Sequence, residues 1–227
     1  RLKDEAAGTG PRLTPVTRPF DIEAKARNVI AFSLWGQDPR YLTGIQHNAI
    51  VARYLYPGWT MRVYTDRSVP EPVLKGLVAQ GADVRIVPET LPAARYGLFW
   101  RFLVEDDPGV DRYMVRDADS VMNIREAAAV ADWIASGRAF HVIRDYPAHS
   151  ELILAGMWGA QRGNLGSIGA RIEAHVEDGA RQLNNRITDQ EFLRTEIWPT
   201  VKQDVCMHDG WFDFGTPVRW WLTAVLT

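Results

Sequence analysis

The sequence predicts an α/β protein with one sizeable domain. Length, composition and an alternation of strand and helix patterns support this prediction. The chain has 227 residues, of which 46% are hydrophobic and 24% are charged. That length suits a single domain with a substantial core, and that composition is typical of globular proteins rather than disordered ones. Short β-rich runs alternate with helical patterns, as in a parallel sheet with crossover helices.

The first half of the chain repeats a strand followed by a helix. Residues 28–34 form an apolar, β-rich run that ends at Trp35, which predicts a buried central strand. Asp38 and Pro39 then provide an N-cap and a first-turn proline for a helix that ends before Pro57. The same patterns predict strands over 61–65, 83–87 and 112–116, and helices over 73–81 and 95–104. Together these units predict a parallel, Rossmann-like half that binds a nucleotide.

The pattern changes after residue 117. A helix over 124–135 precedes a strand over 140–143, a short strand near 154–160 and a helix that begins near residue 165. Roughly the last 35 residues are rich in tryptophan and predict irregular structure. We therefore expect a central mixed sheet flanked by helices in one domain. The expected bounds are an N-terminal arm or linker over 1–24 and a domain over 25–227, divided into a nucleotide half (25–122) and an acceptor half (123–227).

Charge and cysteine content exclude several classes of protein. The formal net charge is -2, which disfavours a dedicated nucleic-acid binder. The single cysteine, Cys206, excludes an intramolecular disulfide and a multi-cysteine zinc site, and it favours a reducing compartment. We expect a cytoplasmic location, with peripheral attachment to a membrane left open. No apolar run approaches the roughly 18 residues that span a bilayer, so no transmembrane segment is expected. The oligomeric state is open.

The most informative motif is Asp117-Ala118-Asp119, at the end of the predicted strand over 112–116. A turn that leaves a strand can aim two carboxylates at one cation. Mn²⁺ and Mg²⁺ prefer such hard oxygen ligands, and a diphosphate needs a metal of this kind to neutralise its charge. Because the motif follows a nucleotide-binding half, it predicts a site for a nucleoside diphosphate. A solvated turn or a helix N-cap is the open alternative.

Together with Phe99-Trp100-Arg101, the acidic motif resembles the GT-A fold glycosyltransferases, whose DxD motif binds the metal and the diphosphate of a nucleotide sugar. Within that group, four later motifs are similar to glycosyltransferase family 8. They contain Asp145, Gly156, Asp189-Gln190 and His208, and the resemblance covers about residues 28–215. Two features differ from that family, because the asparagine of its Asn-x-Gly strand is missing, with Ala155 preceding Gly156, and no lysine follows His208.

The resemblance implies a GT-A type domain and a metal-dependent hexosyltransferase of polysaccharide biosynthesis. Such an enzyme moves a sugar from a UDP- or GDP-sugar to a hydroxyl of a carbohydrate or other acceptor. The implied metal is Mn²⁺, or Mg²⁺, held by Asp117, Asp119 and His208. The implied donor-binding residues are Ser33, Leu34, Asp66, Arg101, Asp117, Ala118, Asp119 and Gly156. The implied catalytic residues are Asp145, Asp189 and Gln190.

Each of these roles has a structural alternative. Arg101 can pair with Glu105 one helical turn later, Asp66 can cap a turn, and Asp189 can cap a helix. A histidine such as His208 can simply be satisfied inside the core. Large aromatic residues are most often buried, which we expect for Trp100, Trp133 and Trp198. The candidates for stacking on an acceptor sugar are Trp158, Trp211, Trp220 and Trp221.

Two other functions fit part of the pattern. Residues 117–121 also match the DxDx[TV] motif of HAD-type phosphatases, in which Asp117 would be the nucleophile. In that superfamily the motif lies on the first strand, whereas three strand and helix units precede it here. Lys202 is the only lysine after the motif. The third hypothesis is a module that binds a nucleotide sugar without catalysis.

Overall fold

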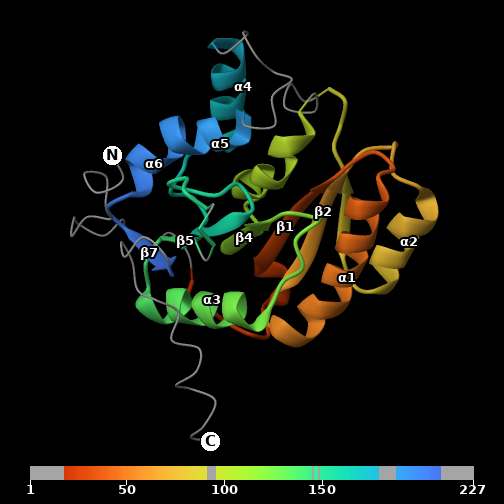
Figure 1. Cartoon of the computed structure of the whole chain (residues 1–227), viewed down its shortest axis with the longest axis horizontal. Coiled ribbons are helices and arrows are strands. Elements are labelled where there is room, and N and C mark those ends of the chain that lie inside the picture. Colours follow the sequence, from red (N-terminus) through yellow and green to blue (C-terminus); the bar gives the residue numbers. More distant parts are fainter. Residues whose placement is uncertain (1–17, 91–95, 145, 148, 179–187, 211–227) are drawn as a thin grey trace, which may run out of the picture.

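The computed structural model describes residues 18–90, 96–144, 146–147, 149–178 and 188–210. In this part of the chain seven strands form one mixed sheet, in the order β3-β2-β1-β4-β6-β5-β7. The strands are β1 (Asn28–Leu34), β2 (Thr60–Thr65), β3 (Asp83–Ile86), β4 (Arg112–Arg116), β5 (Phe140–Arg144), β6 (Met157–Gln161) and β7 (Val205–Asp209). Helices flank the sheet (Figure 1), so the predicted α/β class with a mixed central sheet is confirmed.

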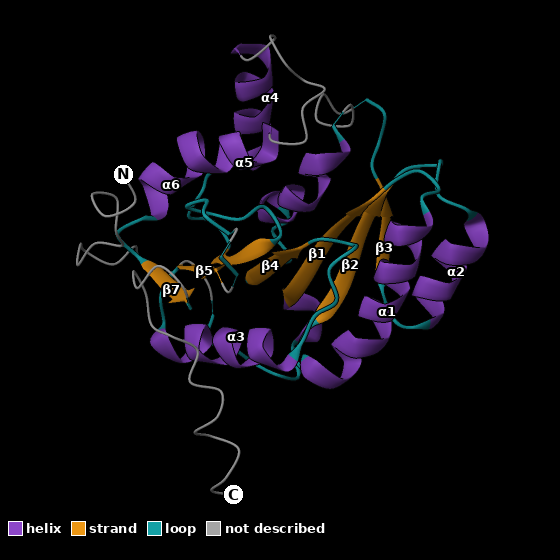
Figure 2. Cartoon of the chain, viewed as in Figure 1, coloured by secondary structure: helices purple, strands orange, loops and turns teal. Residues whose placement is uncertain are grey.

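The helices cover both faces of the sheet (Figure 2). One face carries α1 (Pro39–Leu55), α2 (Glu71–Ala79) and α3 (Ile124–Ser136), and the other carries the 3₁₀ helix η4 (Gly97–Asp106), α4 (Ile168–Asp178), α5 (Thr188–Phe192), the π-helical turn η5 (Leu193–Ile197) and α6 (Trp198–Val201). A short 3₁₀ turn, η2 (Lys25–Arg27), precedes the sheet. Strand β1 is buried on both sides because Ile30 and Phe32 face α1, while Val29 and Ala31 face η4.

The first half of the sheet follows the sequence prediction closely. Strands β3, β2, β1 and β4 pair in parallel. Helix α1 begins where predicted, with the Asp38 carboxylate accepting a hydrogen bond from the Arg40 backbone N–H at 2.9 Å. The segment predicted as a helix over 95–104 is instead the 3₁₀ helix η4. The backbone N–H of Arg101 in η4 donates to the Ser33 hydroxyl, which ties this helix to the end of β1.

The second half of the sheet contains the main departure from prediction. Strand β6 runs antiparallel between β4 and β5, and β7 pairs in parallel with β5. The irregular structure expected for the end of the chain is therefore wrong for β7. This strand carries His208 and Asp209, which break the apolar pattern of a buried strand. Both have partners inside the fold, since His208 bonds to His141 and Asp209 forms an ion pair with Arg144 at 3.1 Å.

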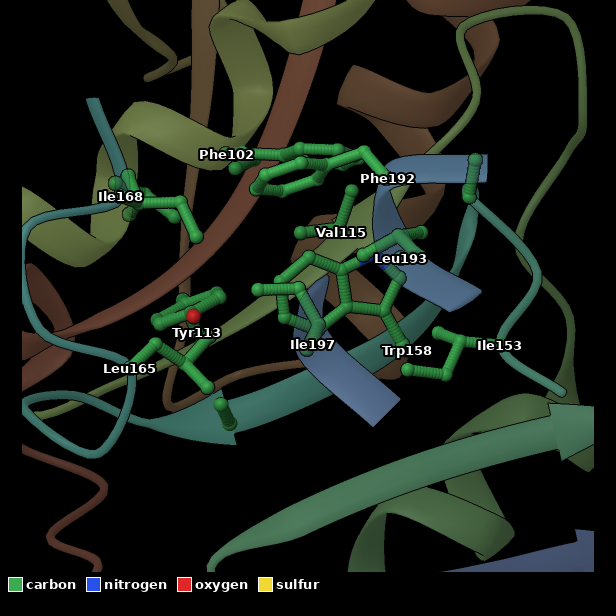
Figure 3. Close-up of a cluster of buried hydrophobic side chains, with 14 of the residues drawn as sticks. Phe102, Tyr113, Val115, Ile153, Trp158, Leu165, Ile168, Phe192, Leu193 and Ile197 are labelled. Atoms are coloured by element: carbon green, nitrogen blue, oxygen red, sulfur yellow. The ribbon is translucent and has the colours of Figure 1, made fainter. Parts of the chain in front are cut away.

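The tryptophans show which aromatic residues build the core. Trp100, Trp133 and Trp198 are buried as predicted. Trp158 lies in the cluster of Figure 3 and stacks on Phe140 with a centroid distance of 5.1 Å. Because Trp158 is fully buried, the hypothesis that it stacks on an acceptor sugar is wrong. The other three tryptophans proposed for that role, Trp211, Trp220 and Trp221, lie outside the described residues.

Residues 18–24, which belong to the expected N-terminal arm, contact the domain. The Phe20 ring packs against Trp59, and the Arg112 guanidinium lies 5.4 Å from its centroid. The Asn28 side chain also donates to the Asp21 carbonyl at 3.1 Å. Among the described helices none has both the length and the apolar character needed to cross a bilayer. The cytoplasmic location stays a prediction.

Candidate functional site

A cavity of about 650 Å³ opens where the strand order reverses. From β1 the chain proceeds to β2 on one side, whereas β4 lies on the other side of β1. Ligands of open α/β sheets bind at such switch points, outside the carboxyl ends of the strands. The residues that line the cavity include Ser33 and Leu34 at the end of β1, Trp35 directly after it, and Asp117, Ala118 and Asp119 after β4.

Helix α1 packs against the turn that contains Asp117 and Asp119, residues 117–120, which we call the acidic turn. A Cβ on Gly44 would lie 2.2 Å from the Ala118 carbonyl oxygen, so only glycine allows this close approach. The side chain of Asn48 donates to the Ser120 carbonyl and accepts from the Met122 N–H, both at 2.9 Å. Asn48 was not among the predicted site residues. The sequence pattern that could have indicated it is the position of a polar residue on the apolar face of a predicted helix.

Arg101 joins two carboxylates from distant segments. Its Nη1 forms an ion pair with Asp117, and its Nη2 lies 3.0 Å from Asp189 Oδ2. Burial by itself lowers the pKa of this guanidinium, but the charges of Asp117 and Asp189 outweigh burial and raise it. The alternative pairing with Glu105 does not form, because Glu105 accepts hydrogen bonds from the backbone of Gly163 and Leu165.

The Asp189-Gln190 pair lies in α5 and faces the cavity. The Asp189 carboxylate accepts one hydrogen bond from the Gln190 backbone N–H at 2.9 Å and another from the Arg101 guanidinium. It therefore contacts the helix backbone and the cation at the same time. The Gln190 side chain accepts from the Ala155 N–H at 2.8 Å, which ties α5 to the loop before β6. Burial, reinforced by the nearby charge of Asp117, raises the pKa of Asp189.

The backbone of Gly156 lies close to the Asp117 carboxylate. A Cβ at this position would lie 2.0 Å from Asp117 Oδ2, well inside contact distance. The Asp117 carboxylate is therefore held between the guanidinium of Arg101 and the backbone of Gly156. Any side chain at residue 156 must displace it.

The second carboxylate of the motif has a different kind of partner. Asp119 Oδ2 lies 2.6 Å from Nη2 of Arg40, a residue near the start of α1. The Arg40 side chain is 68% exposed, whereas that of Arg101 is 6% exposed. Neither the periodicity of α1 nor any motif in the sequence pointed to Arg40.

Two more residues of the cavity extend the predicted set. Trp35 is 43% exposed, and its ring meets Trp100 edge-on at 5.9 Å. Gly97 leaves room for this indole, because a Cβ there would lie 2.7 Å from the ring. His149 also lines the cavity. The sequence signal for Trp35 was its position directly after the first strand.

Two predicted site residues do not join this group. The Asp66 carboxylate caps its own turn by accepting from the backbone and the hydroxyl of Ser68, and it does not line the cavity. The turn alternative therefore describes the contacts of Asp66 in this structure, and its role in binding the donor stays a prediction. Asp145 lies outside the described residues.

His208 is also placed away from the acidic turn, which corrects the predicted metal shell. Its ring bonds to His141 at 3.0 Å and faces Asp132 on α3 at 3.5 Å, below the sheet. Burial lowers the pKa of both imidazoles, and for His141 the charge of His208 adds to this effect. Within the described residues no three His, Cys, Asp or Glu side chains gather to hold a metal. The three-ligand site of Asp117, Asp119 and His208 is not formed.

The lining of the cavity nevertheless fits a divalent cation that takes some of its ligands from a bound phosphate group. Its lining contains the carboxylates of Asp38, Asp117, Asp119 and Asp189 against the single guanidinium of Arg101. An anionic diphosphate would be repelled from this lining unless a cation accompanied it. Mg²⁺ and similar ions are commonly held by one or two carboxylates together with substrate phosphates. Asp117 and Asp119 fit that kind of site.

The phosphatase hypothesis finds little support in this geometry. The acidic motif follows β4, the fourth strand in chain order, whereas in that superfamily it lies on the first strand. Lys202, the only lysine after the motif, does not line the cavity.

No model of a known protein family matches the chain, and no curated protein sequence matches it. Among solved structures, it is similar to the mannosyltransferase PcManGT from Pyrobaculum calidifontis in complex with GDP-Man and Mn²⁺, with 12% identity over 88% of this chain and a TM-score of 0.49. It is also similar to the glycosyltransferase GlyE of Streptococcus pneumoniae, with 16% identity over 74% of this chain and a TM-score of 0.49.

A third similar structure is glucosyl-3-phosphoglycerate synthase from Mycobacterium tuberculosis with UDP, with 16% identity over 68% of this chain and 66% of that one, and a TM-score of 0.43. This chain spans 60% of the length of PcManGT and 42% of that of GlyE. These scores and identities describe a similarity and do not establish family 8.

Proposed function

We propose that this protein transfers a sugar from a nucleoside-diphosphate sugar to a hydroxyl group of a carbohydrate or other acceptor. The observation that carries this proposal is the contact of Arg101 with both Asp117 and Asp189 in one cavity at the switch point of the sheet. Three distant segments thereby combine an acidic turn, a fixed cation and a buried carboxylate. That combination suits a phosphorylated leaving group next to a reacting carbon.

The donor is expected to lie along the cavity from β1 to α5. Its volume of about 650 Å³ is within the range of sites for small molecules and cofactors. We assign the base to the end of β1, near Ser33 and Leu34, and the diphosphate to the turn of Asp117 and Asp119. A divalent metal bound there, Mn²⁺ or Mg²⁺, would neutralise the diphosphate and make it a better leaving group.

Asp189 and Gln190 are assigned to the reacting end of the donor. Arg101 and the Gln190 backbone hold the Asp189 carboxylate in place, and its raised pKa makes it a stronger base than an exposed aspartate. If the reaction inverts the anomeric carbon, Asp189 takes the proton of the acceptor hydroxyl. If the reaction retains it, Asp189 stabilises the positive charge that develops on the sugar. The anomeric configuration of the product, measured by NMR, decides between the two roles.

The proposal is tested by thermal melting with UDP- and GDP-sugars in the presence of Mn²⁺ or Mg²⁺. A ligand at about 100 times its Kd adds about 2.7 kcal/mol to the stability of the folded state, or roughly 5 to 10 °C in Tm. Asp119→Asn is expected to abolish the shift because it removes a carboxylate from the turn. Glu71→Gln, which changes an exposed carboxylate on α2, is the matched control and should show the same ligand-induced Tm shift as the parent.

Two results would contradict the proposal. One is a panel in which no nucleotide shifts the Tm of the parent protein with metal present, while Asp119→Asn melts like the parent. The other is rapid hydrolysis of p-nitrophenyl phosphate, which would favour the phosphatase hypothesis. Slow hydrolysis of a single bound nucleotide sugar would instead support catalysis over binding alone.

A further inference from the structure

The two arginines at the acidic turn differ in how they are held. Arg101 is buried and fixed by Asp117 and Asp189, so its charge is already matched. Arg40 has one acidic partner, Asp119, among the ion pairs of the described residues, and its side chain extends into solvent. An exposed cation therefore pairs with the more buried carboxylate of the motif, since the side chain of Asp119 is 16% exposed and that of Asp117 is 42% exposed.

The backbone of Arg40 is anchored although its side chain is not. Asp38 caps its N–H at 2.9 Å, and Pro39 fixes the first turn of α1. The guanidinium can thus exchange partners by rotating its own side chain, without movement of the helix. Exchange is favourable only if a stronger anion comes within reach, because an exposed ion pair contributes about 1 kcal/mol or less.

A diphosphate that enters with a metal supplies that anion. The metal competes with Arg40 for Asp119, since both are cations that need the same oxygens. The diphosphate then offers the displaced guanidinium two oxygens in the forked geometry that arginine recognises. Arg101 is the one cation in the lining of this cavity among the described residues, and it is already engaged.

We propose that Arg40 is an exchangeable counter-ion of the donor site, bound to Asp119 before the donor arrives and to the donor diphosphate afterwards. This inference rests on the proposed function. It makes metal and nucleotide bind cooperatively, because the metal alone must displace Arg40 whereas the metal with a diphosphate gives Arg40 a new partner. Thermodynamic coupling of this kind is reciprocal for the two ligands.

The test measures two affinities in the full chain. Binding of Mn²⁺ alone is followed by the EPR signal of the free ion, and binding of GDP or UDP at saturating Mn²⁺ is followed by calorimetry. In Arg40→Gln, Mn²⁺ alone should bind more tightly by up to about fivefold, because the exposed ion pair that it displaces is weak, and the nucleotide should bind more weakly by roughly tenfold. Arg53→Gln, at an exposed position on the same helix, should change neither. Arg40→Lys should keep the competition with the metal and lose part of the nucleotide affinity.

The opposite signs of the two changes separate this role from a merely structural one. A variant that had lost its fold would bind both ligands more weakly, which a melting curve also detects. The inference is overturned if Mn²⁺ affinity in Arg40→Gln equals that of the parent, or if both affinities move in the same direction. If the parent binds nucleotide with metal and Arg40→Gln behaves identically, this inference alone fails. If no nucleotide binds the parent at all, the proposed function and this inference fail together.

Discussion

The carboxylate of Asp189 lies 3.0 Å from the guanidinium of Arg101, although 88 residues separate them along the chain. The same guanidinium holds Asp117, so one buried cation connects the acidic turn to the candidate catalytic carboxylate. The three residues come from η4, from the end of β4 and from α5. A change in any one of them is therefore expected to alter the position or charge of the other two.

Replacement of Arg101 should destabilise the fold as well as the site. Arg101→Met leaves the Asp189 carboxylate buried without its cation, which is expected to lower the free energy of unfolding by about 3 to 5 kcal/mol. Urea denaturation measures this loss. Asp189→Asn removes the uncompensated charge, so the double variant should be more stable than the sum of the two single effects. Strict additivity of the two changes would contradict the predicted coupling.

Gly156→Ala should damage the site while leaving the fold intact. The new Cβ displaces the Asp117 carboxylate, and misplacement of a binding group by about 1 Å can cost on the order of a hundredfold in rate. Transfer activity and nucleotide affinity should fall, with a small change in Tm. Gly76→Ala is the matched control, because nothing lies within 4 Å of its added Cβ. In helix α2 that change should stabilise the protein by about 1 kcal/mol and leave activity unchanged. Equal activities of the two variants would contradict the close approach at Gly156.

Asn48→Ala should loosen the acidic turn. The variant leaves the Ser120 carbonyl and the Met122 N–H without their partner, at a cost of about 1 to 3 kcal/mol in the free energy of unfolding. Nucleotide affinity with metal should also fall, since the turn carries Asp117 and Asp119. Gln46→Ala, an exposed amide on the same helix, should have little effect on either quantity. A stability loss with unchanged nucleotide affinity would show that the turn does not depend on Asn48.

The buried histidine pair should make stability depend on pH. Both imidazoles have a pKa below the usual value in the folded state, so near pH 6.5 the unfolded chain binds more protons than the folded one. Stability should be constant above that pH and should fall as the pH decreases, by up to about 1.4 kcal/mol per pH unit for each histidine. Urea denaturation between pH 8 and 5 measures the slope. His208→Gln should reduce it, whereas a change at the exposed His47 should not.

Most of the local structure could be predicted because short-range patterns encode it. The apolar run of β1 and the cap of α1 by Asp38 and Pro39 specify their elements within a few residues. Strand β7 could not be predicted, because its polar residues are stabilised by partners on β5, more than sixty residues earlier in the chain. The 3₁₀ geometry of η4 could not be predicted either. The hydrogen bond from the Arg101 backbone in η4 to Ser33 helps to position Arg101.

The sequence by itself determined the class of the fold, the place of the acidic turn after β4 and the residue types available for chemistry. Only the tertiary structure decided which of those residues meet. The register of β7 against β5 pairs His208 with Ile143 and, by the alternation of side chains along a strand, turns the imidazole toward α3. The packing of α5 against η4 brings Asp189 to Arg101 instead. Strand register and helix packing are sums over many distant contacts, so no local motif specifies them.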